Sequence, residues 1–324
     1  MSARLFVDAW DPGYGSAFEP ADGGAPAAPS SAQLDAGVEL PADAWRPLSP
    51  PADLRAPDVV LLVDGVRRND ARVWTEEDDG TSYAGLAASY AAGAVRCDLR
   101  RGIAELVASR IGRGLFTASP GATDVAAGQV RYAVHRVAHG EPEKLQAAVQ
   151  GPLTELEVGV SVQARAASDG DLLVVDGPLR GRRHLPRTIG YVKTHHRQYL
   201  PASLSTVVTQ LRPGERSPVF RLGTAWGGFS WYLRLPGRPG APWAGVIRGE
   251  CSTELPAQEA IRLADLSAVT LPRFASAAYK DPRAPQNLIP IAGLERKLRG
   301  LLGDPRLLHR ALTLAAAAGR TVPV

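Results

Sequence analysis

The chain has 324 residues, of which 45% are hydrophobic and 22% charged, and its formal net charge is +4. That length suffices for one large domain or two small ones, and the hydrophobic share is ordinary for a globular protein. Its two cysteines, Cys97 and Cys251, lack metal-ligand spacing, which excludes a cysteine-based zinc site and fits a reducing compartment. No stretch is apolar enough to predict a membrane span or a secretory signal, so we expect a soluble cytoplasmic protein.

The first part of the chain predicts little regular structure. Residues 4–9 favour a short strand, and residues 10–57 are rich in proline, alanine, glycine and aspartate. We therefore expect a loop-rich arm with one strand over 1–57 and a single domain over 58–324, since no later linker is strong enough to divide the chain.

Two apolar runs, each followed by Asp-Gly, dominate the pattern. Residues 59–63 precede Asp64-Gly65, and residues 172–175 precede Asp176-Gly177. Uninterrupted runs of β-branched and aliphatic residues predict strands buried on both faces. A carboxylate at the end of such a strand lies at the edge of the sheet where ligands bind, and the glycine permits a sharp turn beside it. The alternative is an ordinary turn, because Asp-Gly is also a common turn signal.

The rest of the chain predicts an alternation of strands and helices. Residues 70–74 are expected to pair antiparallel with the first buried strand, and residues 103–111 to form a short helix. A helical region over 141–167 is interrupted near Gly151. We also expect strands over 83–96, 130–137, 188–193 and 220–222, a hairpin of 229–235 with 243–248, and helices over 204–211 and 287–318.

The order of these elements bears on the fold class. A strand ends in an aspartate, antiparallel strands follow, a helix carries a glutamate, and a later strand ends in the second aspartate. This order resembles that of the ribonuclease H-like fold, so we expect an α/β fold with a mixed sheet of at least five strands, flanked by helices, and a β-hairpin insertion over 218–250. Phosphodiester hydrolysis by such a cluster needs two hard divalent ions, which take oxygen ligands.

Five short segments carry a resemblance to a known family. They are 62–65 (Leu-Val-Asp-Gly), 173–179 (Leu-Val-Val-Asp-Gly-Pro-Leu), 189–193 (Ile-Gly-Tyr-Val-Lys), 246–250 (Val-Ile-Arg-Gly-Glu), and Tyr279 with Asp281-Pro282. Together, over residues 59–295, they resemble the NurA nuclease family. NurA proteins are manganese- or magnesium-dependent nucleases that act on DNA ends as dimers, usually docked on a hexameric HerA-type translocase. The resemblance therefore implies DNA, a HerA-type ATPase and a second copy of the chain as partners, and a role in DNA repair.

The resemblance implies which residues hold the two Mn²⁺ or Mg²⁺ ions. Asp64 and Asp176 match the two metal aspartates, and Glu157 best matches the helical glutamate. Glu155 is its rival, and residues two apart on a helix point in different directions, so only one of them can face the metals. The alternative for Glu157 is a solvent-exposed helix charge.

Other matches are less complete. Lys193 matches a family lysine that would hold the scissile phosphate, or else it is a surface lysine at a strand end. Arg248 and Glu250 are better explained as an ion pair on a strand face. The family's C-terminal histidine is missing; Asn287 or Gln286 would supply an oxygen ligand in its place, or water would, whereas His309 lies too far along the chain.

Clustered basic residues predict a DNA-binding surface, with a solvated basic face as the alternative. The candidates are Arg67, Arg180, Arg182, Arg183, Arg187 and His195, with His196 beside it. Trp226 and Trp231 would either stack bases or pack within a sheet.

Three functions stay open on the sequence alone. The leading hypothesis is a metal-dependent DNA nuclease. The second is a non-catalytic DNA-binding or docking subunit of a ring ATPase, and the third is a ribonuclease H-like enzyme that acts on RNA.

Overall fold

The computed structural model describes residues 33–166, 171–195, 197–223, 227–238 and 240–318. The predicted strand at 4–9, Trp226 and His196 lie outside these residues. The protein is a mixed α/β protein with a large mixed sheet and flanking helices. It divides into two compact units, one made of 1–62, 96–104 and 167–292, the other of 63–95, 105–166 and 293–324.

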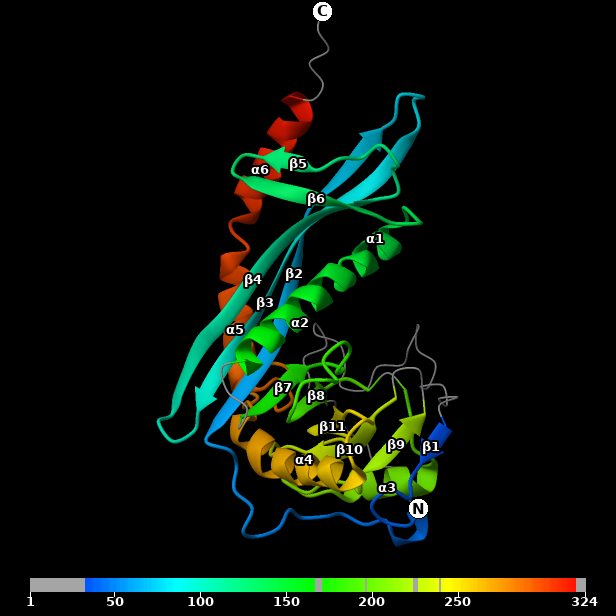
Figure 1. Cartoon of the computed structure of the whole chain (residues 1–324), viewed down its shortest axis with the longest axis vertical. Coiled ribbons are helices and arrows are strands. Elements are labelled where there is room, and N and C mark those ends of the chain that lie inside the picture. The colour runs from blue at the N-terminus through cyan, green and yellow to red at the C-terminus, as the bar shows by residue number, and fades with distance from the viewer. Residues whose placement is uncertain (1–32, 167–170, 196, 224–226, 239, 319–324) are drawn as a thin grey trace, which may run out of the picture. The chain divides into compact units, whose positions relative to one another are not determined.

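The first unit contains a mixed sheet of short strands (Figure 1). Its strand order is β1-β9-β10-β11-β8-β7, followed by β2. All pairs among the first six are antiparallel except β7 with β8, which run parallel with Val174 opposite Ile189. The bounds are β1 Gln33–Asp35, β7 Leu172–Asp176, β8 Thr188–Val192, β9 Phe220–Gly223, β10 Phe229–Arg234 and β11 Val246–Cys251.

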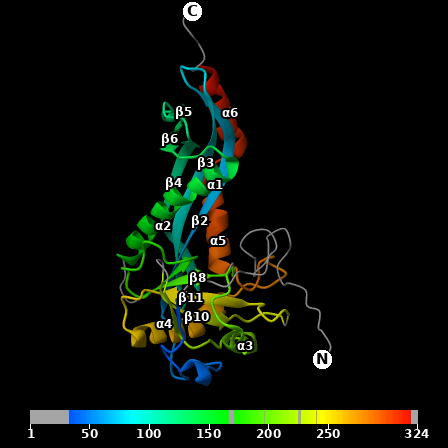
Figure 2. The same ribbon diagram turned by 90° about the vertical axis from the view of Figure 1, so that its right-hand side faces the viewer.

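Two helices, α3 (Ala202–Gln210) and α4 (Ala257–Thr270), cover opposite faces of this sheet (Figure 2). Successive side chains of a strand point to opposite faces. Trp231 of β10 accordingly donates its Nε1–H to Ser267 of α4, 2.9 Å away, whereas the next residue, Tyr232, packs with Leu204 of α3. A short 3₁₀ helix, Leu271–Phe274, continues α4, and another covers Ala42–Ala44.

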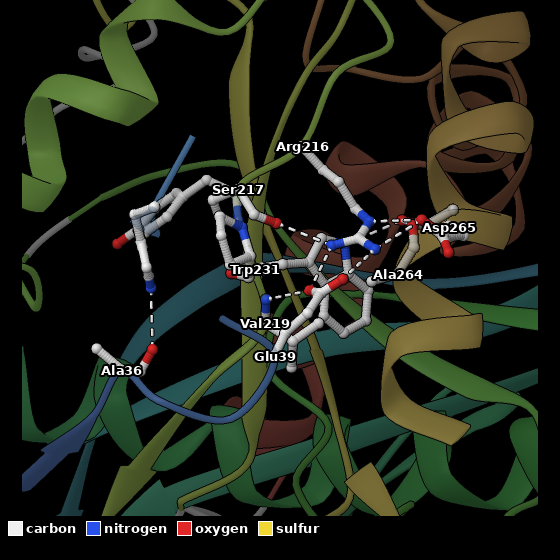
Figure 3. Close-up of polar contacts among 12 residues, drawn as sticks. Ala36, Glu39, Arg216, Ser217, Val219, Trp231, Ala264 and Asp265 are labelled. Atoms are coloured by element: carbon white, nitrogen blue, oxygen red, sulfur yellow. Dashed lines mark hydrogen bonds and ion pairs between the residues drawn. The ribbon is translucent and has the colours of Figure 1, made fainter. Parts of the chain in front are cut away.

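A buried arginine joins three parts of this unit (Figure 3). The side chain of Arg216 is 2% exposed, lies 2.7 Å from a carboxylate oxygen of Glu39, and lies 2.7 Å from one of Asp265 in α4. Although burial works against the charge, the bonds to these two carboxylates raise the pKa of Arg216 overall. The same Glu39 carboxylate accepts the backbone N–H of Val219 at 2.7 Å, so the segment before β2 is fixed to the segment before β9.

Three long strands contribute residues to both units: β2 (Val59–Glu76), β3 (Ser82–Asp98) and β4 (Ile103–Thr117). The prediction that residues 70–74 form a separate strand, antiparallel to the first buried one, is wrong. The strand does not end at Asp64, and residues 70–74 belong to the same strand, β2. The predicted helix at 103–111 is also wrong, because that segment is the first part of β4. Asp98 accepts the N–H of Arg101 at 3.0 Å and Gly102 adopts φ +65°, so a turn starts β4 where local composition favours helix.

The second unit is built on the longer parts of these strands, in the order β2-β3-β4-β6-β5. β6 (Val130–Arg136) runs parallel to β4 and antiparallel to β5 (Val125–Ala127). Helices α1 (Pro142–Ala148) and α2 (Gln150–Arg165) cover one face, and α5 (Ile289–Leu301) with α6 (Pro305–Ala318) covers the other (Figure 2). The helix interruption falls at Val149, two residues before the predicted position.

Most of the other predicted elements are confirmed. Strands form at β3, β6, β7, β8 and β9, the hairpin forms from β10 and β11, and helices form at α3, α5 and α6. None of the helices in the described residues is long and apolar enough to cross a membrane.

Candidate functional site

Asp176 is the last residue of β7, at the end of a strand buried over its whole apolar run. Gly177 follows with φ +90°, a conformation that favours glycine, so the predicted sharp turn is present here. The ammonium of Lys193, the first residue after β8, lies 2.6 Å from Asp176 Oδ2. Because β7 and β8 are parallel neighbours, their carboxyl ends bring these two side chains together.

The amide of Asn287 extends this group. Lys193 Nζ donates to Asn287 Oδ1 at 3.3 Å, and Asn287 Nδ2 donates to Asp281 Oδ2 at 2.6 Å. The amide is therefore oriented with its oxygen toward the lysine. Asn287 and the neighbouring Gln286 are fully buried, but the Gln286 side chain donates to Val246 O at 3.4 Å. Of the two residues proposed to replace the missing histidine, Asn287 is the one whose oxygen faces Lys193.

The turn after Asp176 is fixed by an ion pair from β11. Glu250 accepts the N–H of Leu179 at 2.7 Å with one carboxylate oxygen. Its other oxygen lies 2.8 Å from Arg248, so the expected ion pair is confirmed. Gly190 of β8 makes room for this arrangement, because a Cβ there would lie 2.8 Å from Glu250 Cγ and 3.0 Å from Gly177 O.

Tyr191 of β8 lies opposite Asp176 in the strand register. Its hydroxyl donates to Gln286 O at 2.6 Å. Complete burial, and after it the negative charge of Asp176, raise the pKa of Tyr191 well above its usual value. The phenol therefore stays neutral and keeps donating its hydrogen bond throughout the ordinary pH range.

Asp64 lies within β2 in the second unit and is 9% exposed. Its carboxylate accepts the N–H of Gly65 at 2.7 Å. Unlike Gly177, Gly65 does not end a strand. A Cβ on Gly65 would lie 2.5 Å from Glu157 Oε1 and 2.7 Å from Leu153 Cδ1, so glycine here allows α2 to approach β2 closely.

The structure separates the two rival glutamates of α2. Glu157 is 9% exposed and lies against Gly65, directly after Asp64, whereas Glu155 is exposed. The charge of Glu155 affects Tyr90 instead. Burial first, and this charge second, raise the pKa of the Tyr90 phenol. Only Glu157 is thus brought to the same part of β2 as Asp64.

Glu295 of α5 is an acidic residue that sequence reasoning missed. Its side chain is 12% exposed and lies 3.7 Å from Arg299. It follows Ile291 by four residues and precedes Leu298 by three, so it falls on the apolar, buried face of an amphipathic helix. A carboxylate on an otherwise apolar helix face is the feature of the sequence that could have identified Glu295.

The acidic residues have the donor chemistry that a hard divalent cation requires. Carboxylate and amide oxygens suit Mg²⁺ and Mn²⁺, and no soft ligand is needed. Asp64, Asp176 and Glu295 each offer a carboxylate of this kind. Asp64 and Glu295 belong to the second unit and Asp176 to the first.

The predicted DNA-binding residues fall into two groups. Arg67 and Arg180 are exposed, and Arg183 and Arg187 are half-buried. Arg182 is 1% exposed and donates to Leu179 O and Pro178 O, and His195 is 5% exposed and shares a hydrogen bond with Val246 O at 3.0 Å. These two side chains stabilise the interior and do not reach a ligand outside it. Trp231 is fully buried, so it packs within the sheet and does not stack on bases.

Comparisons with known proteins yield no relative by sequence: no family model matches the chain, and no curated protein matches it. One solved structure to which it is similar is an endonuclease V from Bacillus subtilis, with 14% identity over 75% of this chain and 80% of that chain. The TM-score of 0.32 is too low to establish a shared fold. The site itself must therefore indicate what the protein does.

Proposed function

We propose that the protein is a divalent-metal-dependent nuclease of the NurA type, with a ribonuclease H-like core, that hydrolyses phosphodiester bonds at DNA ends in the cytoplasm. The observation that carries the proposal is the group at the end of β7. There, Asp176 is joined to Lys193 at 2.6 Å, and Lys193 to the oriented amide of Asn287 at 3.3 Å. A carboxylate, a cation and an amide oxygen at a strand end suit a phosphate ester and its counter-ions.

The continuity of β2 supports the participation of Asp64. Residues 59–62 of β2 belong to the same unit as β7, and β7 is followed by β2 in the strand order. Asp64 comes two residues after Leu62 in one strand, so its Cα stays within about 7 Å of the Leu62 Cα. We propose that the carboxylates of Asp64, Asp176 and Glu295 are ligands of the cations, with Glu157 beside Asp64.

The residues of the proposed site then have distinct roles. Two bound Mn²⁺ or Mg²⁺ ions would supply Lewis acidity to the scissile phosphate and lower the pKa of the attacking water. Asp64, Asp176 and Glu295 would hold them, and Asp281 keeps the oxygen of Asn287 turned toward Lys193. Lys193 exchanges its bond to Asp176 for one to a phosphate oxygen and stabilises the charge that develops there.

The proposed DNA-binding residues are Arg180, Arg183 and Arg187 of the first unit and Arg67 of the second, without Arg182 and His195. Arginines that contact phosphates give strong but sequence-independent binding, which suits an enzyme that acts on ends of any sequence. A second copy of the chain and a HerA-type hexameric ATPase are the protein partners that the family resemblance implies, with DNA end resection as the setting.

A nuclease assay tests the proposal. We expect the purified chain to degrade end-labelled DNA with Mn²⁺ and not with EDTA, and we expect Asp64→Asn and Asp176→Asn to abolish cleavage while melting cooperatively. Asp53→Asn removes an exposed carboxylate and serves as the matched control, which should cleave normally. Undiminished cleavage by both site variants would eliminate this function. Matched RNA substrates in the same assay would identify a ribonuclease.

One observation favours a second function, a non-catalytic DNA-binding or docking subunit. Lys193 already neutralises Asp176, and the family's C-terminal histidine is missing, so a stable fold does not require a cation there. Thermal melting distinguishes the two functions. A nuclease site should be stabilised by Mn²⁺, and Asp176→Asn should lose this stabilisation. Melting that is indifferent to Mn²⁺, with DNA binding retained, would identify the non-catalytic subunit.

A further inference from the structure

A cavity of about 600 Å³ lies in the first unit, beside the loop that connects β10 to β11. Its walls come from the end of α3, from this loop and from the segment 276–285. This volume is within the range of small-molecule sites. The described residues that line it include Arg212, Arg234 and Arg238 but no aspartate or glutamate. The cavity therefore carries positive charge that its own walls do not balance.

Arg234 is one of the three arginines that line the cavity. Its guanidinium donates to the carbonyl oxygens of Thr209 at 3.2 Å and Pro242 at 2.6 Å, and also to that of Ala244. Its Nε is buried without a hydrogen-bond partner, and no carboxylate among the described residues pairs with it. Burial lowers the pKa of this guanidinium, in the direction expected where no carboxylate offsets the cost of burial.

Ser276 is a second group with unused hydrogen-bonding capacity. It lines the same cavity and is 7% exposed, and its hydroxyl is buried with no hydrogen-bond partner among the described residues. A buried hydroxyl without a partner costs stability. A ligand oxygen in the cavity would satisfy the hydroxyl, just as an anion would balance Arg234.

The remaining walls are apolar and closely built. Leu235, Ala284 and Pro285 contribute aliphatic surface, and a Cβ on Gly245 would lie 3.0 Å from Leu235 O and 3.3 Å from Pro285 Cγ. Arg212 and Arg238 also line the cavity, and both are exposed. One part of a ligand must therefore be anionic, and another part must tolerate contact with aliphatic side chains.

We propose that this cavity binds a phosphate monoester with a flat, apolar body, such as a nucleoside 5′-monophosphate, either free or as the terminal residue of a strand. The phosphate supplies the counter-charge for the three arginines and an acceptor for Ser276, and the base lies against Leu235 and Pro285. Arginine is suited to phosphate because its planar donors bind two oxygens at once.

The cavity is connected to the proposed catalytic group by one segment. Ala284 and Pro285 line the cavity, and two residues later Asn287 bonds to Lys193. A bound terminal nucleotide would therefore be held next to the chain that orients Asn287. The binding proposal does not require metal chemistry, so it can succeed or fail separately from the nuclease proposal.

Calorimetric titration of the full chain with adenosine 5′-monophosphate, adenosine and inorganic phosphate tests the proposal. We expect the monophosphate to bind and to raise the melting temperature, phosphate to bind more weakly, and adenosine not to bind. A short oligonucleotide with a 5′-phosphate, compared with its 5′-hydroxyl form, identifies the source. Tighter binding of the phosphorylated strand than of the free nucleotide indicates a strand end, and the reverse order indicates a free nucleotide.

Variants at the exposed arginines keep the test independent of folding. The double variant Arg212→Gln and Arg238→Gln should weaken monophosphate binding by about tenfold or more, with an unchanged melting temperature in the absence of ligand. Arg55→Gln, an exposed arginine that does not line the cavity, is the matched control. Ser276→Ala should also weaken binding while melting at the same or a higher temperature, because it removes a hydroxyl without a partner.

Two results would overturn the proposal. One is an affinity for the monophosphate that the double variant leaves unchanged. The other is binding that does not depend on the phosphate, with adenosine or the 5′-hydroxyl strand bound as tightly as the phosphorylated form. Mn²⁺-dependent stabilisation measured on the same variants should stay intact, because none of the changed residues belongs to the proposed metal site.

Discussion

At the scale of single residues, two of the buried charged groups are compensated by partners of opposite charge. Arg216 is balanced by Glu39 and Asp265, and Asp176 by Lys193. Burial raises the pKa of the Asp265 carboxyl, and the charge of Arg216 only partly opposes that change. Removing one member of such a group leaves the others charged and without water, which costs more than the group contributes in total.

Arg216→Ala should therefore destabilise the protein by about 3–5 kcal/mol, because it leaves two buried carboxylates without their cation. Arg221→Ala is the matched control. Arg221 pairs with Asp35 at 3.2 Å, but both side chains are about half exposed (54% and 48%), so its loss should cost less than about 1 kcal/mol. Urea unfolding measures both changes. Equal losses in the two variants would show that burial of the Arg216 group contributes nothing.

The buried thiol of Cys97 should make the free energy of unfolding depend on pH in the alkaline range. Burial raises the pKa of its thiol from 9.0 to about 11. Since the folded-state pKa lies above the unfolded one, the thiol's contribution is complete below pH 9 and is lost as the pH rises through 11. Two pKa units correspond to about 2–3 kcal/mol at most. Urea unfolding of Cys97→Ala should show a shallower loss between pH 8.5 and pH 11 than the parent chain, and equal slopes would contradict this assignment.

At the scale of elements, the two Asp-Gly pairs have different structural roles. Gly177 has φ +90° and turns the chain, whereas Gly65 stays within β2 and gives α2 the space to approach. The same Asp-Gly dipeptide therefore forms a turn after β7 and allows close helix packing against β2. Which of the two roles an Asp-Gly pair has depends on the residues that pack against its glycine, and those residues are distant in sequence.

Gly65→Ala should separate α2 from β2, because the added Cβ would lie 2.5 Å from Glu157 and 2.7 Å from Leu153. We expect a loss of about 1–3 kcal/mol and a marked loss of cleavage if Glu157 takes part in catalysis. Gly151→Ala in the same helix meets nothing within 4 Å and should be neutral or stabilising. Thermal melting and the nuclease assay measure both. A Gly65→Ala protein as stable as the parent chain would refute the close approach of α2.

The sequence was informative where local signals agree with the fold. The run before Asp176, the strand that ends near Lys193 and the C-terminal helices were predictable, because hydrophobic periodicity and turn residues coincide there. β4 was not, because its Ala- and Leu-containing start favours a helix and pairing with β3 overrides that preference. The placement of Glu295 and the burial of His195 depend on contacts between segments that are distant in sequence. Local sequence patterns do not reveal such contacts.

At the scale of the whole molecule, the charge of +4 is spread over 37 basic and 33 acidic residues, so positive potential depends on local clusters. Arg180, Arg183 and Arg187 all lie between β7 and β8 in the first unit, after the strand that carries Asp176. A basic connection next to a proposed catalytic carboxylate would guide the DNA backbone toward it.

The salt dependence of DNA binding tests this distribution of charge. Replacing Arg180, Arg183 and Arg187 by glutamine should lower the slope of log affinity against log salt by about 2–3 for duplex DNA, since each phosphate that the protein no longer neutralises lowers it by about 0.9. The same replacement at the exposed Arg46, Arg55 and Arg100 changes the net charge equally and is the control. Fluorescence anisotropy over a range of NaCl concentrations gives both slopes. Equal slopes would mean that overall charge, and not this cluster, binds the DNA.

The partnership of Glu39, Arg216 and Asp265 also has a consequence for biosynthesis. During translation the ribosome releases Glu39 first and Asp265 last, so the cation in between must wait for α4 to emerge. Until then Arg216 can pair with Glu39 alone and lacks the second carboxylate, which α4 supplies. We expect arrested nascent chains to gain protease resistance abruptly once Asp265 has left the exit tunnel, and Asp265→Ala chains to gain it less completely at the same length.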